Sequence, residues 1–222
     1  MGKFIVIEGT DCSGKETQSK LLVEKLTSMG KKAVRITYPN YDSPTGKIVG
    51  GPYLGKEEIC KCWFPEGAVN VDPKVTSLYY AADRKYNEKE IRKYLDDDYF
   101  VICDRYTSSN MAHQGSKIRD DSERFNMYQW IDKLEFWLLG LPKPDKTIFL
   151  HVPYSYAFEL KKNRISLDEH EKNEEHLKNS EVAYLELASY YNWTSISCVK
   201  EDKMRTIEDI NEEIINNIKE YL

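Results

Sequence analysis

The sequence predicts an α/β protein in which a parallel sheet of five strands is flanked by helices. Short apolar runs alternate along the chain with longer segments of helical periodicity, and strands separated by helices form parallel sheets. A glycine-rich loop connects the first apolar run directly to the first helical segment. The chain has 222 residues, 41% of them hydrophobic, which suffices to bury one core. Because no repeat or linker interrupts the sequence, we expect one domain over residues 1–222.

The expected strands are short apolar runs bounded by polar residues, glycine or proline. Pro39 ends the second of them. The segment 40–67 that follows is rich in glycine and proline, so we expect it to be irregular, with room for a short helix. The five expected strands cover residues 3–8, 33–38, 99–103, 147–152 and 194–199.

The expected helices carry apolar residues at helical spacing. Leu22 and Leu26 share one face of the first helix, which Gly30 ends. Asp72 is placed to cap the second helix, and Pro73 occupies a first position where proline is tolerated. The expected helices cover residues 15–29, 73–95, 121–139, 154–163, 171–191 and 207–222.

Composition and charge exclude several classes of protein. The net charge of −5 disfavours general nucleic-acid binding, which needs a basic face. The first residues have the pattern of a strand and not of a signal peptide, and no apolar run is long enough to span a membrane. Five scattered cysteines favour reduced thiols and a cytoplasmic protein. A zinc site at Cys60 and Cys62 is disfavoured, because no second pair lies at suitable spacing.

The glycine-rich loop is the strongest local signal in the sequence. It follows a strand and opens a helix, which is the context of the phosphate-binding P-loop. Its glycines let backbone N–H groups converge on an anion, the helix N-terminus adds partial positive charge, and Lys15 reaches the outer phosphates. The alternative is a glycine-rich turn that only caps the helix. The sequence therefore predicts a three-layer P-loop NTPase fold whose loop, Gly9, Thr10, Asp11, Cys12, Ser13, Gly14 and Lys15, binds the phosphates of ATP.

The residue after Lys15 departs from the P-loop pattern. Serine or threonine usually stands there and contacts Mg²⁺, whereas this chain has Glu16 followed by Thr17. Thr17 lies about 100° further round the helix, so it cannot simply substitute. Glu16 could repel phosphate, turn away or bind the metal as a carboxylate. Our hypothesis is that Glu16 stays near Mg²⁺, directly or through water.

A second polar cluster follows the third expected strand. Asp104 ends that strand beside the expected P-loop and is a candidate to hold Mg²⁺ or its waters. Arg105 follows directly and can grip a phosphate group with two hydrogen bonds. Taken alone, such a pair is more often a surface ion pair.

In these residues and in several other segments, the chain resembles the thymidylate kinase family over nearly its whole length. The matches run in the family's order: residues 9–15, 17–18, 78–84, 104–106 with Ser109, Ala112, Gln114 and Gly115, then 141–145 and 184–188. The resemblance implies Mg²⁺-dependent transfer of the γ-phosphoryl group of ATP to dTMP. It also implies a homodimer. The aromatic residues of the expected helix 121–139 are candidates for the interface or for ordinary core: Phe125, Tyr128, Trp130, Phe136 and Trp137.

The resemblance assigns a role to each matching residue. Asp11 would lie between the donor and acceptor phosphates, and Asp104 would support Mg²⁺. Arg84 and Arg105 would hold the phosphate of dTMP. Tyr80 would stack on thymine, and Gln114, with Ser109, would bond the base or sugar. Without the resemblance, Arg84 would be a solvated charge and Tyr80 a core residue.

Three departures from the family pattern affect these assignments. His113 stands where relatives usually carry Tyr or Phe, whose ring crowds the sugar 2′ position, so the sequence predicts a less strict preference for deoxyribose. Asn40 follows Pro39 where relatives often have an arginine, so more of the phosphate charge falls on Arg84 and Arg105. Cys12 stands where some relatives place a P-loop arginine. Other relatives supply that charge from a mobile lid. In this chain we expect the lid over residues 160–176. Arg164 is the best candidate for the transferred charge, with Lys161 or Lys162 as substitutes.

Two other functions remain open from the sequence. One is a kinase of the same architecture that acts on a deoxynucleoside or another monophosphate. The other is a nucleotide-binding regulator without turnover, for which Glu16 is the supporting feature.

Overall fold

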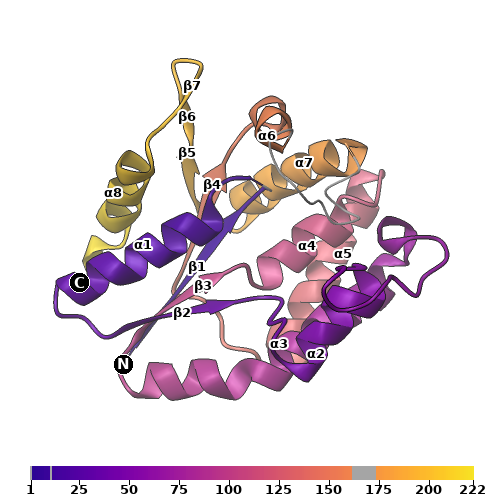
Figure 1. Ribbon diagram of the computed structural model, residues 1–222, viewed down its shortest axis with the longest axis horizontal. Coiled ribbons are helices and arrows are strands. Elements are labelled where there is room, and N and C mark those ends of the chain that lie inside the picture. Colours follow the sequence, from indigo (N-terminus) through magenta and orange to yellow (C-terminus); the bar gives the residue numbers. More distant parts are fainter. Residues whose placement is uncertain (1, 11, 162–173) are drawn as a thin grey trace.

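The computed structural model describes residues 2–10, 12–161 and 174–222, and these form a parallel sheet between two layers of helices (Figure 1). The sheet has five strands in the order β2-β3-β1-β4-β5, which confirms the predicted fold class. Its strands are β1 (Lys3–Gly9), β2 (Ala33–Thr37), β3 (Phe100–Asp104), β4 (Lys146–His151) and β5 (Thr194–Ser197).

The helices divide between the two faces of the sheet because successive strand residues point to opposite sides. Ile5 and Ile7 of β1 belong to the core cluster beneath the helices α1 and α8, whereas Phe4 and Val6 belong to a cluster on the other face, beneath α3. The helices α4, α5 and α7 pack against Phe149 on that same face. The eight α-helices of the described residues are α1 (Lys15–Ser28), α2 (Pro44–Ile48), α3 (Pro73–Asp96), α4 (Thr107–Gly115), α5 (Asp121–Asp132), α6 (Tyr154–Lys161), α7 (Glu174–Tyr190) and α8 (Ile207–Asn217).

The described part of the chain also contains four helical segments that are not α-helical. Two are π-helices and two are 3-10 helices. They are η1 (Val49–Tyr53), η2 (Ala68–Asn70), η3 (Lys133–Leu138) and η4 (Lys219–Tyr221). A two-stranded antiparallel hairpin, β6 (Val199–Lys200) and β7 (Lys203–Met204), lies outside the main sheet.

The strand register sets the place of the site. The β1 strand pairs with β3 so that Ile7 lies opposite Asp104, and with β4 so that Gly9 lies opposite Leu150. Thr37, the last residue of β2, also lies opposite Asp104. Because all these strands are parallel, the loops that follow β1, β2 and β3 leave the sheet on the same side, at the carboxyl ends of the strands.

Four elements differ from the prediction. The last helix, expected over residues 207–222, ends at Asn217 and is followed by η4. The fifth strand ends at Ser197, and the β6–β7 hairpin follows where continuation to residue 199 was expected. The expected helix 121–139 is α-helical only to Asp132 and then continues as η3. The helix α4 was not predicted, because its Ser- and Asn-rich sequence has modest helix propensity, and it forms between buried surfaces that override this. The expected lid lies largely outside the described residues, which omit 162–173.

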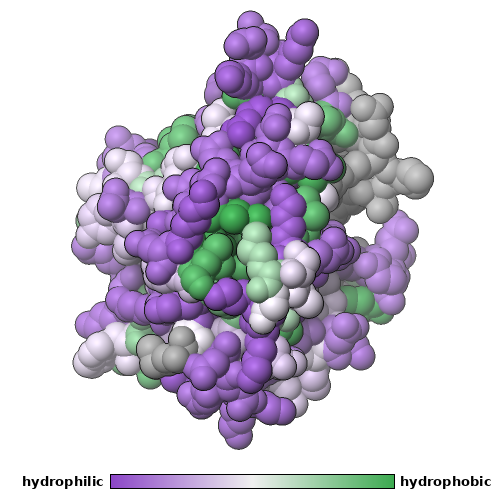
Figure 2. Space-filling view, turned by 90° about the vertical axis from the view of Figure 1, so that its left-hand side faces the viewer, coloured by the Kyte–Doolittle hydropathy of each residue, from purple (hydrophilic) through white to green (hydrophobic). Residues whose placement is uncertain are grey.

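The surface on the side of α1 and α8 is mostly hydrophilic, with a limited apolar patch near its centre (Figure 2). Across the described residues, no helix combines the length and apolar character that crossing a bilayer requires.

Candidate active site

The loop between β1 and α1 has the backbone geometry of a phosphate cradle. Cys12 and Gly14 adopt left-handed conformations, with φ of 61° and 78°, which turn successive N–H groups inward. Gly9 is sterically required, because a Cβ there would lie 2.4 Å from Ser13 Oγ and 2.7 Å from the carbonyl oxygen of Leu150. Gly14 is the N-cap residue of α1, and among the described residues no side chain caps this helix.

Lys15 opens α1 and bends back over the loop. Its Nζ donates to the carbonyl oxygen of Thr10 at 2.7 Å and to Ser13 Oγ at 3.4 Å, and the side chain is buried. The ammonium group therefore lies within the loop, where it would contact an anion bound by the backbone N–H groups. Asp11, predicted to assist transfer, lies outside the described residues.

A pocket opens over this loop, and we call it the P-loop pocket. The P-loop pocket is lined by residues from the P-loop, the start of α1 and the ends of β2 and β3. Several of them are predicted to bind phosphate or metal. The lining residues are Cys12, Gly14, Lys15, Glu16, Thr17, Arg35, Thr37, Tyr38, Pro39, Tyr41, Asp104 and Arg105.

Two carboxylates line the P-loop pocket, and each forms an ion pair with a basic side chain. Glu16 Oε1 lies 2.6 Å from Lys20 Nζ in an exposed pair within α1. Asp104 is buried, and its Oδ2 accepts from Arg35 Nη2 at 2.5 Å. Arg35 is a residue that the sequence did not single out. A lone arginine in an apolar strand carries no motif, and only the register of β2 on β3 reveals its partner.

These carboxylates suit a metal that is held only partly by protein. Among residues 2–10, 12–161 and 174–222, no three His, Cys, Asp or Glu side chains converge on one point. Mg²⁺ typically takes one or two carboxylates and keeps water and phosphate oxygens as its other ligands. Asp104 and Glu16 provide oxygen ligands of this type, so the residues present fit Mg²⁺ bound together with a nucleotide.

A second pocket, which we call the inner pocket, adjoins the first. It is lined by Tyr38, Pro39, Tyr41, Leu54, Tyr80, Arg84, Arg105, Tyr106, Ser109, Asn110, His113 and Gln114. Four of these residues, Tyr38, Pro39, Tyr41 and Arg105, also line the P-loop pocket. The two pockets therefore share a wall, and Arg105 is part of it.

Arg105 is held in an unusual backbone conformation. Its φ is 66°, in the left-handed region that non-glycine residues rarely adopt. Its N–H donates to the carbonyl oxygen of Ile7 at 3.2 Å, and its own carbonyl accepts from Cys103 Sγ at 3.1 Å. Its Nη1 lies 3.3 Å from His113 Nε2. Such strain is concentrated at functional sites, where the surrounding structure enforces it.

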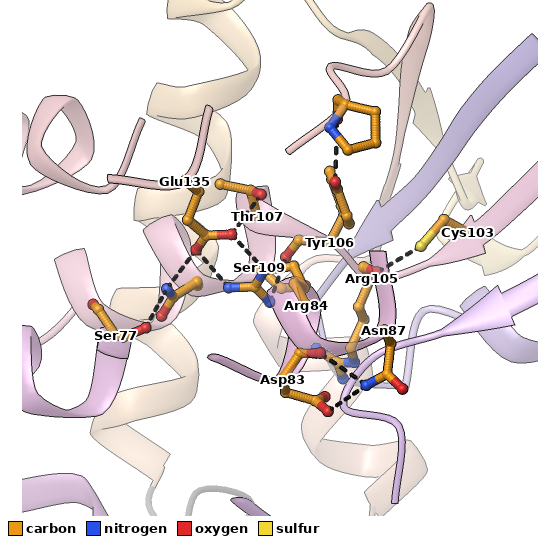
Figure 3. A network of polar contacts seen from close by, with 12 residues as sticks. Ser77, Asp83, Arg84, Asn87, Cys103, Arg105, Tyr106, Thr107, Ser109 and Glu135 are labelled. Carbon is orange, nitrogen blue, oxygen red and sulfur yellow. Dashed lines mark hydrogen bonds and ion pairs between the residues drawn. The ribbon is translucent and has the colours of Figure 1, made fainter. Parts of the chain in front are cut away.

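Arg84 is buried, so the expectation of a solvated charge is wrong. Its Nε and Nη2 donate to the two carboxylate oxygens of Glu135 at 2.5 and 2.6 Å, and Nη1 lies 3.4 Å from the carbonyl oxygen of Tyr106 (Figure 3). Burial lowers the pKa of Arg84, but Glu135 outweighs this and holds the pKa above its ordinary value. The charge of Arg84 is thus compensated within the protein.

The other predicted acceptor residues also converge on the inner pocket. Tyr80 is half-buried and meets the ring of Tyr53 edge-on at 5.9 Å. The Ser109 hydroxyl donates to Glu8 Oε2 at 2.6 Å. The His113 ring lies edge-on to Tyr184.

Two amide side chains leave polar atoms available in the inner pocket. Gln114 is wholly buried, yet within the described structure neither its amide nitrogen nor its oxygen has a hydrogen-bond partner. Asn110 Oδ1 is likewise buried without a partner. Because buried polar groups are normally satisfied, these atoms indicate a ligand that completes them.

Glu8 was missed by sequence reasoning, although a charged residue in the apolar run of β1 was a signal. It is fully buried and accepts from the N–H groups of Tyr106 and Ser109 at 2.9 and 3.1 Å. Burial raises its pKa above the ordinary value, against the hydrogen bonds that lower it. Glu8 ties the strand before the P-loop to the start of α4, and so ties the two pockets together.

Asp83 is a second missed residue, which holds the loop after β2. It is buried and accepts from the N–H of Asn40 at 2.8 Å and from Thr45 Oγ1 at 2.9 Å. It also accepts from Asn87 Nδ2 at 3.0 Å (Figure 3). The loop it anchors carries Pro39 and Tyr41 into both pockets.

The chain is similar to known proteins over nearly its whole length. A profile of the Thymidylate kinase family matches residues 7–214. The thymidylate kinase of Plasmodium falciparum is 32% identical over 98% of this chain and 90% of its own length. A probable thymidylate kinase of Methanocaldococcus jannaschii is 34% identical, covering 97% of this chain and 95% of its own. The structure of thymidylate kinase from Candida albicans has the same fold, with a TM-score of 0.74 over 99% of this chain and 92% of that one at 24% identity.

Proposed function

Because the chain belongs to the thymidylate kinase family, we propose that it transfers the γ-phosphoryl group of ATP to dTMP, giving dTDP and ADP. The observation that carries this proposal is the wall shared by the P-loop pocket and the inner pocket. Direct transfer between two phosphate esters requires two anion sites in line and close together. Arg105, in the shared wall, is suited to contact both.

The P-loop pocket is proposed to bind the triphosphate of ATP. Backbone N–H groups of residues 9–17, the N-terminus of α1 and Lys15 would hold the phosphates. Asp104 and Glu16 would hold Mg²⁺, with Arg35 and Lys20 giving up part of their present contacts. When bound, the metal neutralises charge on the phosphate oxygens.

The inner pocket is proposed to bind the acceptor nucleotide. The imide edge of thymine presents an N–H between two carbonyl groups. Asn110 Oδ1 can accept from this N–H, and Arg84 Nη1 and the amide of Gln114 can donate to the carbonyls. The ring of Tyr80 would lie against the base, and His113 and Ser109 near the sugar.

The phosphate of dTMP would then lie at Arg105. We therefore assign the phosphate charge to Arg105 and not to Arg84, because Glu135 compensates the charge of Arg84. The chain's own contribution to catalysis is alignment and positive charge at the transferred group, supplied by Lys15 and Arg105. Asp11 between the two phosphates, and Arg164 in the segment 160–176, remain proposals on residues outside the described structure.

A hydrophobic pocket distinguishes a methyl group by only about 1–3 kcal/mol. We therefore propose that dUMP is also phosphorylated, less efficiently than dTMP.

We propose that the protein is a homodimer, supported by an apolar stripe on α3. Val75, Leu78 and Tyr86 are exposed along one side of this helix. Most of the aromatic residues first considered for the interface pack into the core, whereas Trp137 is exposed. The dimer predicts that Leu78→Glu halves the molecular mass measured by light scattering.

A cytoplasmic location is proposed on the cysteines. All five are free thiols, as expected for a reducing compartment.

The proposed function is tested with a panel of nucleosides and nucleoside monophosphates, with ATP, in the presence and absence of Mg²⁺. We expect dTMP to be the best acceptor and turnover to require Mg²⁺. A preference for a nucleoside or for a different monophosphate would replace dTMP as the substrate. ATP binding without any product would instead indicate a non-catalytic regulator.

A further inference from the structure

One carboxylate, that of Glu135, organises the polar groups of the inner pocket without lining it. Glu135 lies in η3, is fully buried and accepts four hydrogen bonds (Figure 3). Two come from Arg84 on α3, as described above. The other two come from α4: Thr107 Oγ1 donates to Oε2 at 2.8 Å, and Asn110 Nδ2 donates to Oε1 at 2.9 Å.

An ionised carboxylate can only accept hydrogen bonds, and this fixes the orientation of Asn110. Its amide must turn the NH₂ group toward Glu135, so that its oxygen, Oδ1, is the atom without a partner. Asn110 is therefore held as an acceptor for whatever enters the pocket. The carbonyl oxygen of Ser77 accepts from the same Nδ2 at the longer distance of 3.4 Å, so Glu135 makes the shorter of the two contacts that hold this orientation (Figure 3). A donor in place of Glu135 would remove the shorter contact and favour rotation of the amide.

The contact with Glu135 also determines which nitrogen of Arg84 can donate to a ligand. It takes both Nε and Nη2 in a two-pronged contact, which leaves Nη1 beside the carbonyl oxygen of Tyr106 at the long distance of 3.4 Å. Arg84 lines the inner pocket, and Nη1 carries two N–H groups, so one of them can still donate to a ligand while the charge of Arg84 is compensated. One acceptor and one donor are fixed by the same carboxylate.

We infer that Glu135 is a positioning residue that sets the hydrogen-bond polarity of the inner pocket and thereby selects a base with an imide edge. Thymine and uracil present an N–H beside a carbonyl, which matches Asn110 Oδ1 and Arg84 Nη1. Cytosine presents the reverse, a ring nitrogen acceptor beside an amino donor. This inference rests on the proposed function, since it assumes that the acceptor base enters the inner pocket.

The test is the substitution Glu135→Gln, which keeps the shape of the side chain and adds an NH₂ donor. We measure kcat/KM for dTMP, dUMP and dCMP with ATP. The dTMP:dCMP ratio is expected to fall by at least about tenfold, because sites built on hydrogen bonds owe their selectivity to correct pairing. The dTMP:dUMP ratio, which reports only the methyl group, is expected to stay within about twofold. A purely structural role would lower all three values alike and leave both ratios unchanged.

Glu88→Gln is the matched control. Glu88 is also a buried carboxylate that pairs with two cations, Lys85 and Arg92, but it lies outside the inner pocket. Its substitution is expected to leave the dTMP:dCMP ratio at the wild-type value.

Glu135→Gln leaves the charge of Arg84 buried without its carboxylate, which can prevent folding. A second variant therefore tests the inference independently of that outcome. In Arg84→Met/Glu135→Met both charges are removed, and apolar replacement of a buried ion pair generally preserves stability. Its relative affinity for dTMP and dCMP, measured by calorimetry, is expected to shift toward dCMP by at least about tenfold.

Selectivity that survives in either folded variant would overturn the inference, and so would a wild-type protein that accepts dTMP and dCMP equally. A wild-type protein without any activity on nucleoside monophosphates would instead overturn the proposed function. The two failures are distinguishable, because the first leaves phosphorylation of nucleoside monophosphates intact in the wild-type protein and the second does not.

Discussion

Arg105→Ala removes a guanidinium group from the wall that the P-loop pocket and the inner pocket share. A charge-assisted hydrogen bond contributes about 1.5–3 kcal/mol, and a guanidinium group can make two to one phosphate. Allowing for partial replacement by water, we expect a loss of about 3–4 kcal/mol in transition-state binding. At about 1.4 kcal/mol for each factor of ten, kcat/KM for dTMP falls by about 10²–10³.

The fold should tolerate this change. Residue 105 has a φ of 66°, and alanine suffers the same left-handed strain as arginine. We expect the free energy of unfolding in urea to change by less than about 1 kcal/mol. Arg105→Gly loses the same side chain but relieves the strain, so it should be about 1 kcal/mol more stable than the alanine variant and equally inactive.

Arg105→Lys separates charge from geometry. Lysine keeps the positive charge but not the planar fork, so its kcat/KM should lie between those of wild type and the alanine variant. The measurement is steady-state kinetics with dTMP varied at saturating ATP. An alanine variant within about threefold of wild type would refute the assignment of the acceptor phosphate to Arg105.

Four further predictions concern other parts of the structure. Glu16→Ala, which leaves no oxygen ligand in the side chain at this position, should weaken the apparent affinity for Mg²⁺ in a titration of nucleotide binding, and an unchanged affinity would remove Glu16 from the metal site. Gly9→Ala should weaken ATP binding by at least about tenfold in calorimetry, since its Cβ would lie 2.7 Å from the carbonyl oxygen of Leu150 and the loop must shift. Asp72→Ala removes the acceptor for two N–H groups at the start of α3, so urea unfolding should show a loss of about 1 kcal/mol with unchanged kinetics. Burial lowers the pKa of Lys117 from 10.5 to about 8, so between these pH values the unfolded chain binds more protons than the folded one. The free energy of unfolding of wild type, measured relative to Lys117→Met, should therefore rise by up to about 3 kcal/mol from pH 8 to pH 10.5, and a falling difference would contradict the shift.

The parts of the fold that the sequence predicted depend on local information. The P-loop was recognisable because its glycines, its lysine, the strand before and the helix after are consecutive in the chain. The five strands were recognisable as apolar runs. The helix α4 was missed because its residues favour caps and turns when exposed, and only burial between neighbouring elements makes them helical.

Contacts between distant residues account for what the sequence could not provide. Glu135 is 51 residues from Arg84, and Arg35 is 69 residues from Asp104. Neither pair has a spacing that marks it, because each is created by the way helices or strands lie side by side. Glu8 carried a weak signal, a charge inside an apolar strand, but its partners Tyr106 and Ser109 are about a hundred residues away.

Arg84 and Arg105 illustrate this limit most clearly. Each follows an aspartate and each belongs to a segment that resembles the same family, so the resemblance assigns both the same role. Their surroundings differ: Arg84 is buried against Glu135, whereas Arg105 lies in the wall between the two pockets. A compensated guanidinium group adds hydrogen-bond direction but little net charge, and two phosphates that approach one another require net charge. We therefore propose that the first arginine recognises the base and the second holds the phosphate, a difference in role that depends on their surroundings in the folded chain.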